Sequence, residues 1–329
     1  MPPRELGYDR SRLDRLRHGA VVVTARPAVF RLEGRGALTC LQGLLTSDLD
    51  KPGDHSLTYG ALLTPKGAIV VDYWVFREPG EFTLVAPPES RAASLDLFRR
   101  QVPPRLARIT DLTDEVQVAW LLGSQGFAAL ARSAIKPVPD TAGRTAVVEY
   151  PGGRLLLGLA PETALFAAVA LGPEAVVGRF VQTLAGAGVA EGTAEDLEAA
   201  RILAGWPALG AEIDDRTLPQ EVRYDQLGGV SYTKGCYVGQ ETVARLHFRG
   251  HTNRELRGLI WRGAAPLEGD AVTAAGRPVG SVRSTLVLDD RLLGLAPIRR
   301  EVTTGEEVEA GGRRARVVGL PFAAEDLDG

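Results

Sequence analysis

The chain has 329 residues, of which 45% are hydrophobic and 24% charged, a balance typical of a folded protein with about two or three domains. Its 38 Lys and Arg residues against 41 Asp and Glu residues give a net charge of −3, so we expect no direct nucleic-acid binding. The N-terminal stretch lacks an apolar signal-peptide core, and the longest apolar runs are too short to span a bilayer. We therefore expect a cytoplasmic protein that has no membrane contact.

The first part of the chain predicts a strand, a helix and a series of hairpins. Residues 29–34 are strand-like, and the run that follows, 35–49, has helical periodicity. The residues that share one face of this helix are Ala37, Leu38, Leu41, Leu44 and Leu45. Residues 60–88 alternate apolar runs with Pro- and Gly-containing turns, which is typical of hairpins.

Two helices and a strand follow, before a second unit that begins after a loop at 135–144. We expect helices near 88–100 and 124–133 with a strand at 116–123 between them. A Gly-Gly hairpin comes next, and Pro161 is placed to open a helix at its first turn. A further helix is expected at 173–185.

The next segment predicts a capped helix, and the chain then changes character. Thr193 and Asp196 have the spacing of a capping box. After residue 253, short apolar runs separated by Gly-containing turns predict a small all-β domain that forms a barrel. Hairpins in place of regular crossovers predict an α+β fold and not a doubly wound sheet. We expect three parts: 1–115, 116–252 and 253–329.

The chain has two cysteines, Cys40 and Cys236, and no C-x-x-C pair, so we expect neither a disulfide framework nor a metal site. Cys40 lies beside the apolar face of the predicted helix and is expected to be a small buried thiol. Cys236 lies in the glycine-flanked stretch KGCYVGQE, two residues after Lys234. A nearby positive charge favours the thiolate, so this thiol could be reactive, or it could be a small residue tucked under a turn.

The run 242–249 follows this stretch, and its apolar residues Ala244, Leu246 and Phe248 alternate with basic ones. This period of two predicts a half-buried strand with a basic face. No histidine is clearly placed to form a triad with Cys236, so whether the protein is an enzyme stays open.

Residues 201–256 resemble the signature region of the YgfZ family, folate-binding proteins that support iron–sulfur enzymes. The motif residues that carry the resemblance are Lys234, Gly235, Cys236, Tyr237, Gly239, Gln240 and Glu241. Nearly the whole chain is similar to the larger superfamily of the glycine-cleavage T protein, a tetrahydrofolate-dependent aminomethyltransferase. The stretches concerned are 32–49, 62–76, 277–298 and 320–322. The resemblance implies an α+β folate-binding core, of which residues 1–115 form the N-terminal part. A C-terminal β-barrel closes this core.

The resemblance also implies folate contacts. Glu212 occupies the place of a superfamily folate-site glutamate, and Arg201 and Arg223 are candidates for the glutamate tail or the pocket wall. Trp74 could supply an aromatic wall, and Asp72 a carboxylate at the folate. For each residue a purely structural role, in the core or at the surface, is the alternative.

One departure from the superfamily concerns transfer chemistry. Aminomethyltransferases carry paired aspartates in the central hairpin, whereas this chain has Val71 followed by Asp72. An apolar side chain can neither exchange a proton nor stabilise a cation, so this substitution argues against aminomethyl transfer.

The resemblance implies a tetrahydrofolate-binding protein that supports maturation or repair of iron–sulfur enzymes, including tRNA-modifying ones, with Cys236 as a functional thiol. Its partners would be folate and iron–sulfur client enzymes or assembly factors, and we expect a monomer. The first alternative is a folate-dependent aminomethyl or one-carbon transferase of the T-protein type. A second alternative is a folate-sensing module in which Cys236 is structural.

Overall fold

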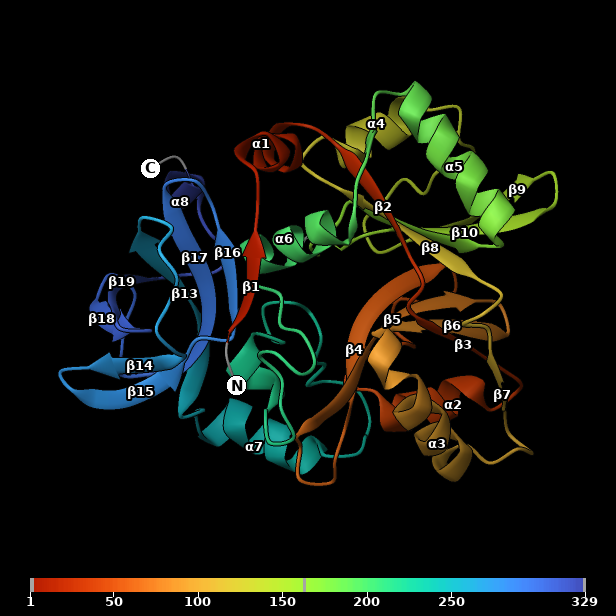
Figure 1. Ribbon diagram of the computed structural model, residues 1–329. Helices are drawn as coiled ribbons and strands as arrows, with labels where there is room; N and C mark the ends of the chain where they lie inside the picture. The colour runs from red at the N-terminus through yellow and green to blue at the C-terminus, as the bar shows by residue number, and fades with distance from the viewer. Residues whose placement is uncertain (1–2, 162–163, 328–329) are drawn as a thin grey trace.

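The computed structural model describes residues 3–161 and 164–327 and is an α+β protein, as predicted. Figure 1 shows two sheets with helices on their outer sides and a group of C-terminal strands, in blue, on the other side of the molecule. Among the described residues, no helix combines the length and the apolar character needed to cross a bilayer.

The first sheet has the strand order β4-β5-β6-β3-β7, and neighbouring strands run antiparallel. The strands are β3 (Ala28–Glu33), β4 (Ser56–Leu63), β5 (Ile69–Glu78), β6 (Glu81–Ala86) and β7 (Arg108–Asp111). Helices α2 (Ala37–Leu44) and α3 (Arg91–Gln101) cover one face, and the short 3₁₀ turn η1 (Pro88–Ser90) precedes α3. The predicted strand, helix and hairpins are therefore confirmed.

The second sheet has the order β12-β2-β8-β11-β10-β9. Its strands are β2 (Val21–Ala25), β8 (Gln117–Leu122), β9 (Thr145–Tyr150), β10 (Gly153–Leu159), β11 (Ala168–Gly172) and β12 (Ala190–Glu191). Helices α4 (Gly126–Arg132) and α5 (Glu174–Gly186) pack on one face. Both were predicted, to within a few residues.

The prediction that a helix begins at Pro161 is wrong for the described residues of this run. The apolar run after the turn forms the buried strand β11, whose Ala168 pairs with Leu121 of β8 and whose Leu171 pairs with Leu156 of β10. Short apolar runs fit a buried strand as well as a buried helix, and here the open edges of β8 and β10 decide. Residues 162–163 lie outside the described part.

The C-terminal strands form a sheet of order β1-β16-β17-β13-β19-β18-β14-β15, and β17 also pairs with β15. The strands from β17 round to β15 therefore close into a barrel, as predicted. The barrel strands are β13 (Arg254–Arg262), β14 (Ala271–Ala274), β15 (Arg277–Ser281), β17 (Arg291–Arg299), β18 (Glu307–Ala310) and β19 (Arg313–Val318). Strand β16 (Ser284–Val287) pairs with β17 outside the ring. The short helix α8 (Ala324–Leu327) follows.

The N-terminal strand β1 (Arg4–Gly7) lies beside these C-terminal strands and not in the sheets that follow it in sequence. It pairs in parallel with β16, and Figure 1 shows it, in red, next to the blue strands. Helix α1 (Arg10–His18) then leads to the second sheet. The predicted part boundaries at 115 and 252 stay a prediction.

Helix α6 (Ala194–Ala204) lies between the second sheet and the C-terminal strands and begins with the predicted capping box of Thr193 and Asp196. The 3₁₀ turn η2 (Pro219–Val222) follows later. The strand predicted at 242–249 is wrong, because Gln240–Arg249 form helix α7.

A helical period explains α7. Val243 is fully buried and Leu246, one turn later, is half-buried, whereas Phe248 is 66% exposed. The alternation of apolar and basic residues was therefore a coincidence of a short run.

Candidate functional site

A cavity of about 390 Å³ lies between the inner faces of the two helix-covered sheets and α6, a size suited to a small molecule. Its walls are mainly apolar and include several aromatic side chains. The aromatic side chains are Tyr59, Trp74, Trp120, Phe166 and Trp206. Trp74 and Trp206 stack with ring centroids 5.5 Å apart, while Phe166 meets Trp74 and Trp120 edge-on at 4.7 and 4.8 Å. These interlocked rings form a preorganised apolar slot.

Asp72 lines this slot from the middle of β5. Its Oδ2 accepts a hydrogen bond of 2.6 Å from the hydroxyl of Tyr59, which lies 3.0 Å from the hydroxyl of Tyr224. Among the described residues its Oδ1 is buried and has no hydrogen-bond partner. Burial raises the pKa of Asp72, since the charged form is poorly solvated there. A buried carboxylate oxygen without a donor is costly, and it can accept a hydrogen bond from an N–H group that reaches it.

The alternation of β5 decides which residues reach the cavity. Asp72 and Trp74 point to it, whereas Val71 packs in the core beneath α2 and α3. An acid at position 71 would lie in that apolar core and not in the cavity. The argument against transfer chemistry drawn from Val71 is therefore wrong in its physical basis.

Arg201 reaches the cavity from α6, but all five of its guanidinium N–H groups have acceptors within the protein. It donates to both carboxylate oxygens of Glu198 at 2.7 Å, and to Glu212 at 2.9 Å. Its other two acceptors are the Trp206 carbonyl and the Ser284 hydroxyl. Arg201 was predicted to contact an anionic ligand tail. To do so, it would have to give up one of these hydrogen bonds.

Glu212 lies behind Arg201 and is not among the residues that line the cavity. Its side chain is 0% exposed, and it accepts hydrogen bonds from Arg201, the hydroxyl of Ser284 and the backbone N–H of Ala208. Glu212 therefore holds α6 and β16 together rather than facing a ligand directly.

Arg223 also lies away from the cavity-lining residues. It donates to the carbonyls of Ala204 and Gly205 at the end of α6 and to that of Leu320 near the C-terminus. Burial lowers the pKa of Arg223 to about 10. Its donors satisfy carbonyls that the end of a helix leaves free.

The KGCYVGQE stretch is anchored by its lysine. Lys234 Nζ is buried and donates to the carbonyls of Leu45 and Ser47 at 2.8 and 2.7 Å, just beyond the end of α2. It also lies 5.2 Å from the ring centroid of Tyr237. Burial lowers the pKa of Lys234 to about 8. The Lys234 ammonium group, which was predicted to act on Cys236, therefore binds backbone carbonyls beneath the loop.

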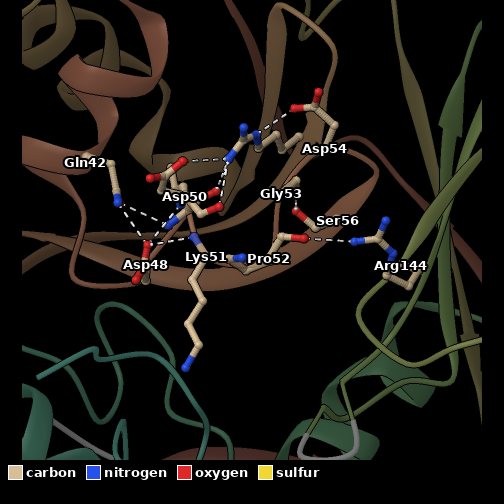
Figure 2. A network of polar contacts seen from close by, with 11 residues as sticks. Gln42, Asp48, Asp50, Lys51, Pro52, Gly53, Asp54, Ser56 and Arg144 are labelled. Atoms are coloured by element: carbon tan, nitrogen blue, oxygen red, sulfur yellow. Dashed lines mark hydrogen bonds and ion pairs between the residues drawn. The ribbon is translucent and has the colours of Figure 1, made fainter. Parts of the chain in front are cut away.

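The segment that receives Lys234 is itself held by polar contacts, which Figure 2 shows. Asp48 Oδ1 accepts from the side chain of Gln42 at 2.9 Å and from the backbone N–H of Asp50 at 2.9 Å. Arg77 bridges from β5 to Asp54 at 2.8 Å, and Arg144 donates to the Pro52 carbonyl at 2.9 Å. These bonds fix the corner on which the motif rests.

Cys236 is presented to solvent between two buried anchors. Lys234 and Tyr237 are buried, whereas Gly235 and Cys236 are exposed. Cys236 does not line the central cavity. The alternative of a small residue tucked under a turn is therefore wrong, because the thiol faces outward.

The end of the motif begins α7. The N–H of Gln240 donates to the Tyr237 carbonyl, and Glu241 is exposed in the first helical turn, where a negative charge is favourable.

Comparisons with known proteins give the family and the fold of the chain. No family model matches the chain. The tRNA-modifying protein YgfZ of Enterobacter sp. (strain 638) is 30% identical over 278 residues, which is 80% of each chain. The chain belongs to the YgfZ family. The tRNA-modifying protein YgfZ of Cronobacter sakazakii is 28% identical over 319 residues, covering 91% of this chain and 92% of the relative.

The fold is that of a glycine cleavage system aminomethyltransferase T, solved from Bartonella henselae. The TM-score is 0.78 with 18% identity, over 95% of this chain and 89% of that one. This agreement confirms the fold expected for a YgfZ family member from its resemblance to the T-protein superfamily.

Sequence reasoning missed several residues of the central cavity. One of them is Glu198, which lines the cavity and whose carboxylate forms an ion pair with Arg201. The signal was present, because an acid three residues before an arginine on a helix forms an ion pair on one face. The aromatic walls Trp120, Phe166 and Trp206 come from segments far apart in sequence, and only the fold brings them together.

Gly239→Ala should destabilise the protein by about 1–3 kcal/mol, because Gly239 has φ +82° and a Cβ would lie 2.6 Å from the Thr64 carbonyl oxygen. Gly235→Ala is the matched control. A Cβ there meets no atom within 4 Å, and its cost should stay within about 0.5 kcal/mol. Urea unfolding of both variants checks this, and equal stabilities would contradict the role given to Gly239.

Proposed function

We propose that this YgfZ family member binds tetrahydrofolate in the central cavity and supports maturation or repair of iron–sulfur enzymes in the cytoplasm, with Cys236 as a functional thiol. The observation that carries the folate part is Asp72, which lines an aromatic slot and whose buried Oδ1 has no hydrogen-bond donor among the described residues. A buried acceptor without a donor is costly to the protein and is satisfied when a ligand brings an N–H group.

A reduced pterin has the properties that such a slot selects. It is bicyclic with a flat pyrimidine ring, and one edge carries several N–H donors next to each other. The stacked rings of Trp74 and Trp206 provide apolar surface for the ring faces. The carboxylates of Asp72 and Glu198 offer acceptors for the N–H edge.

The iron–sulfur part of the proposal concerns Cys236. The thiol is exposed on a loop anchored on both sides, which suits a group that acts on a partner rather than on a ligand in the cavity. Two cysteines cannot supply four thiolates to a cluster, so a cluster would be held by the client enzyme or assembly factor.

The relatives are named for tRNA modification. We place this link in client iron–sulfur enzymes that modify tRNA, with no direct contact between this chain and nucleic acid. The protein would act as a monomer on these partners.

A folate-dependent transferase is the second candidate. Asp72 favours it, because a buried carboxylate of raised pKa lines the cavity in a fold shared with an aminomethyltransferase. Such an enzyme would transfer the methylene carbon of an aminomethyl donor to tetrahydrofolate, with release of ammonia and of the protonated carrier. It would lose turnover in Asp72→Asn and keep it in Cys236→Ala. Absence of turnover with the parent protein would exclude it.

Asp72→Asn should weaken tetrahydrofolate binding by about 10- to 100-fold, because one charge-assisted hydrogen bond contributes about 1.5–3 kcal/mol. Quenching of the fluorescence of the cavity tryptophans, or calorimetry, measures the loss. Asp215→Asn, at an 89% exposed side chain, is the matched control and should bind like the parent. Equal affinities of the two variants would contradict the folate proposal.

Asp72→Asn should also be more stable than the parent protein at pH 7. Burial raises the native pKa of Asp72, so its favourable contribution is full below the unfolded value of 3.8 and is lost as the pH rises through the native pKa. Above that pH the native state holds a poorly solvated carboxylate, which asparagine removes. A rise in melting temperature together with weaker binding would separate a ligand-binding role from a structural one.

A further inference from the structure

The outer face of α7 carries an exposed aromatic side chain between two arginines. Phe248 is 66% exposed, more than any other large hydrophobic side chain in the described part of the chain. Arg245 lies three residues before it and Arg249 one residue after it, and both are exposed. Residues three and four apart on a helix are neighbours, so these three side chains share one face, directed away from the buried Val243. Figure 1 shows α7, in teal, near the lower edge of the molecule.

Two further rings hold Phe248 in place. The rings of Tyr232 and His247 stack with their centroids 3.6 Å apart, and Phe248 meets them edge-on at 6.0 and 4.8 Å. Asp225 fixes this pair, because it accepts a hydrogen bond from the Tyr232 hydroxyl and its Oδ2 lies 3.9 Å from His247 Nδ1. An exposed ring that is already ordered by its neighbours loses little conformational entropy when a partner binds.

The two arginines of this face have charge to offer. Within residues 3–161 and 164–327, neither guanidinium group forms an ion pair or a hydrogen bond. The acid of α7, Glu241, lies in the first helical turn, whereas Arg254 and His251 add exposed basic side chains just beyond the helix. This face is therefore basic in a chain whose net charge is −3, and it favours an acidic partner.

The same helix begins at the loop that carries Cys236. The N–H of Gln240 donates to the Tyr237 carbonyl, one residue after the thiol. Phe248 lies about 12 Å along the helix axis from Gln240, because each helical residue adds about 1.5 Å. An ordinary protein interface, of about 800 Å² per partner, is wider than that distance. One partner can therefore contact Phe248 and the exposed thiol together.

We propose that Arg245, Phe248 and Arg249 form a docking surface that holds a partner protein against Cys236. The partner presents an apolar side chain to Phe248 and Asp or Glu carboxylates to the two arginines. Aromatic residues and Arg are enriched among the side chains that carry binding energy at protein interfaces. The inference rests on the proposed role of Cys236 and extends it, because it names the chemistry of the partner.

Two other occupants fit this face less well. Two arginines neutralise few phosphates, and the chain as a whole is negatively charged, so a nucleic acid would gain little from binding here. A second copy of the chain would bring two basic faces together, and like charges across an interface are unfavourable. An acidic protein surface has the charge that both alternatives lack.

The first measurement uses fluorescein-labelled probes: a peptide of glutamates around one tryptophan, its counterpart built from lysines, and oligouridine. The parent protein should bind the glutamate peptide and not the lysine peptide. Phe248→Ser, and separately the double variant of Arg245→Ser and Arg249→Ser, should weaken binding of the glutamate peptide about 3- to 10-fold. Phe127→Ser and Arg132→Ser, at exposed positions of α4, are the matched controls and should bind like the parent.

The second measurement is the activity of iron–sulfur enzymes in cells under oxidative stress. Both surface variants should lose activity, although the thiol is present and the affinity for tetrahydrofolate is parental. Because these variants only weaken docking, a higher concentration of the variant protein should restore the activity by mass action. The same increase should not restore Cys236→Ala, which lacks the sulfur atom itself.

The outcomes separate the docking surface from the proposed function. If Cys236→Ala keeps full activity, the role of the thiol is wrong, and the peptide measurement still decides about the surface. If Cys236→Ala loses activity and the surface variants behave like Phe127→Ser, the docking surface is wrong. Binding of both peptides equally, or of neither, would overturn the acidic partner. Tighter binding of oligouridine than of the glutamate peptide would make the occupant a nucleic acid and would also overturn the proposal.

Discussion

Replacement of Glu212 by alanine will lower the free energy of unfolding by about 3–5 kcal/mol, because it leaves the buried guanidinium of Arg201 without its innermost counter-charge. The side chains are 0% and 9% exposed, so water cannot compensate for the lost carboxylate. Two further donors lose their acceptor, namely the hydroxyl of Ser284 and the backbone N–H of Ala208. Each unsatisfied buried group adds to the cost.

Urea unfolding measures this loss, with Glu309→Ala, at an exposed position of the barrel, as the control that should change little. Glu212→Gln keeps acceptor geometry but not charge, and should fall between the two. A loss below about 1 kcal/mol for Glu212→Ala would mean that Glu198 alone satisfies Arg201. In that case the assignment of Glu212 to holding α6 and β16 together would be wrong.

Local patterns in the sequence were enough for most elements of the fold. The apolar runs of β4 to β6 and the turns between them predict the hairpins because each strand pairs with its sequence neighbour. The capping box of α6 was found from two residues, since Thr193 and Asp196 satisfy each other's backbone N–H groups regardless of the rest of the fold.

Elements that depend on distant partners could not be found this way. Strand β1 pairs with β16, which lies in the C-terminal part of the chain, and nothing in the short sequence of β1 indicates that partner. Strand β11 and helix α7 were assigned the wrong type because short apolar or alternating runs fit either structure. In each case the tertiary surroundings made the choice.

The candidate site was predicted in part for the same reason. Asp72, Trp74 and Arg201 reach the cavity, but Glu212 and Arg223 bind within the protein instead. The type of a residue indicates what it could bind, whereas the direction of its side chain depends on strand parity and on packing. Parity also explains Val71, since one step along β5 moves a side chain to the other face of the sheet.

Cys236→Ala will cause a loss of iron–sulfur enzyme activity in cells under oxidative stress as large as that caused by deletion of the gene. The thiol is exposed, and the loop that carries it is held by Lys234 and Tyr237, so removing one sulfur atom leaves the fold and the cavity intact. The variant protein should therefore remain abundant, unfold like the parent and bind tetrahydrofolate with parental affinity.

Cys40→Ala is the matched control, because Cys40 is half-buried against the core beneath α2 and should not affect iron–sulfur enzymes. A Lys234→Met variant tests the anchor separately. Lys234 Nζ holds the loop on the Leu45 and Ser47 carbonyls, so its loss should reduce activity and also make the loop more sensitive to proteolysis, which Cys236→Ala should not do.

The comparison of these variants decides what the motif does. If Cys236→Ala retains full activity while Lys234→Met loses it, the loop acts as a surface and the thiol has no chemical part. If Cys236→Ala loses activity although its loop is as protease-resistant as the parent's, the lost function belongs to the sulfur atom itself. The buried lysine and the exposed cysteine then have separate roles within one motif: the first fixes the loop, and the second meets the partner.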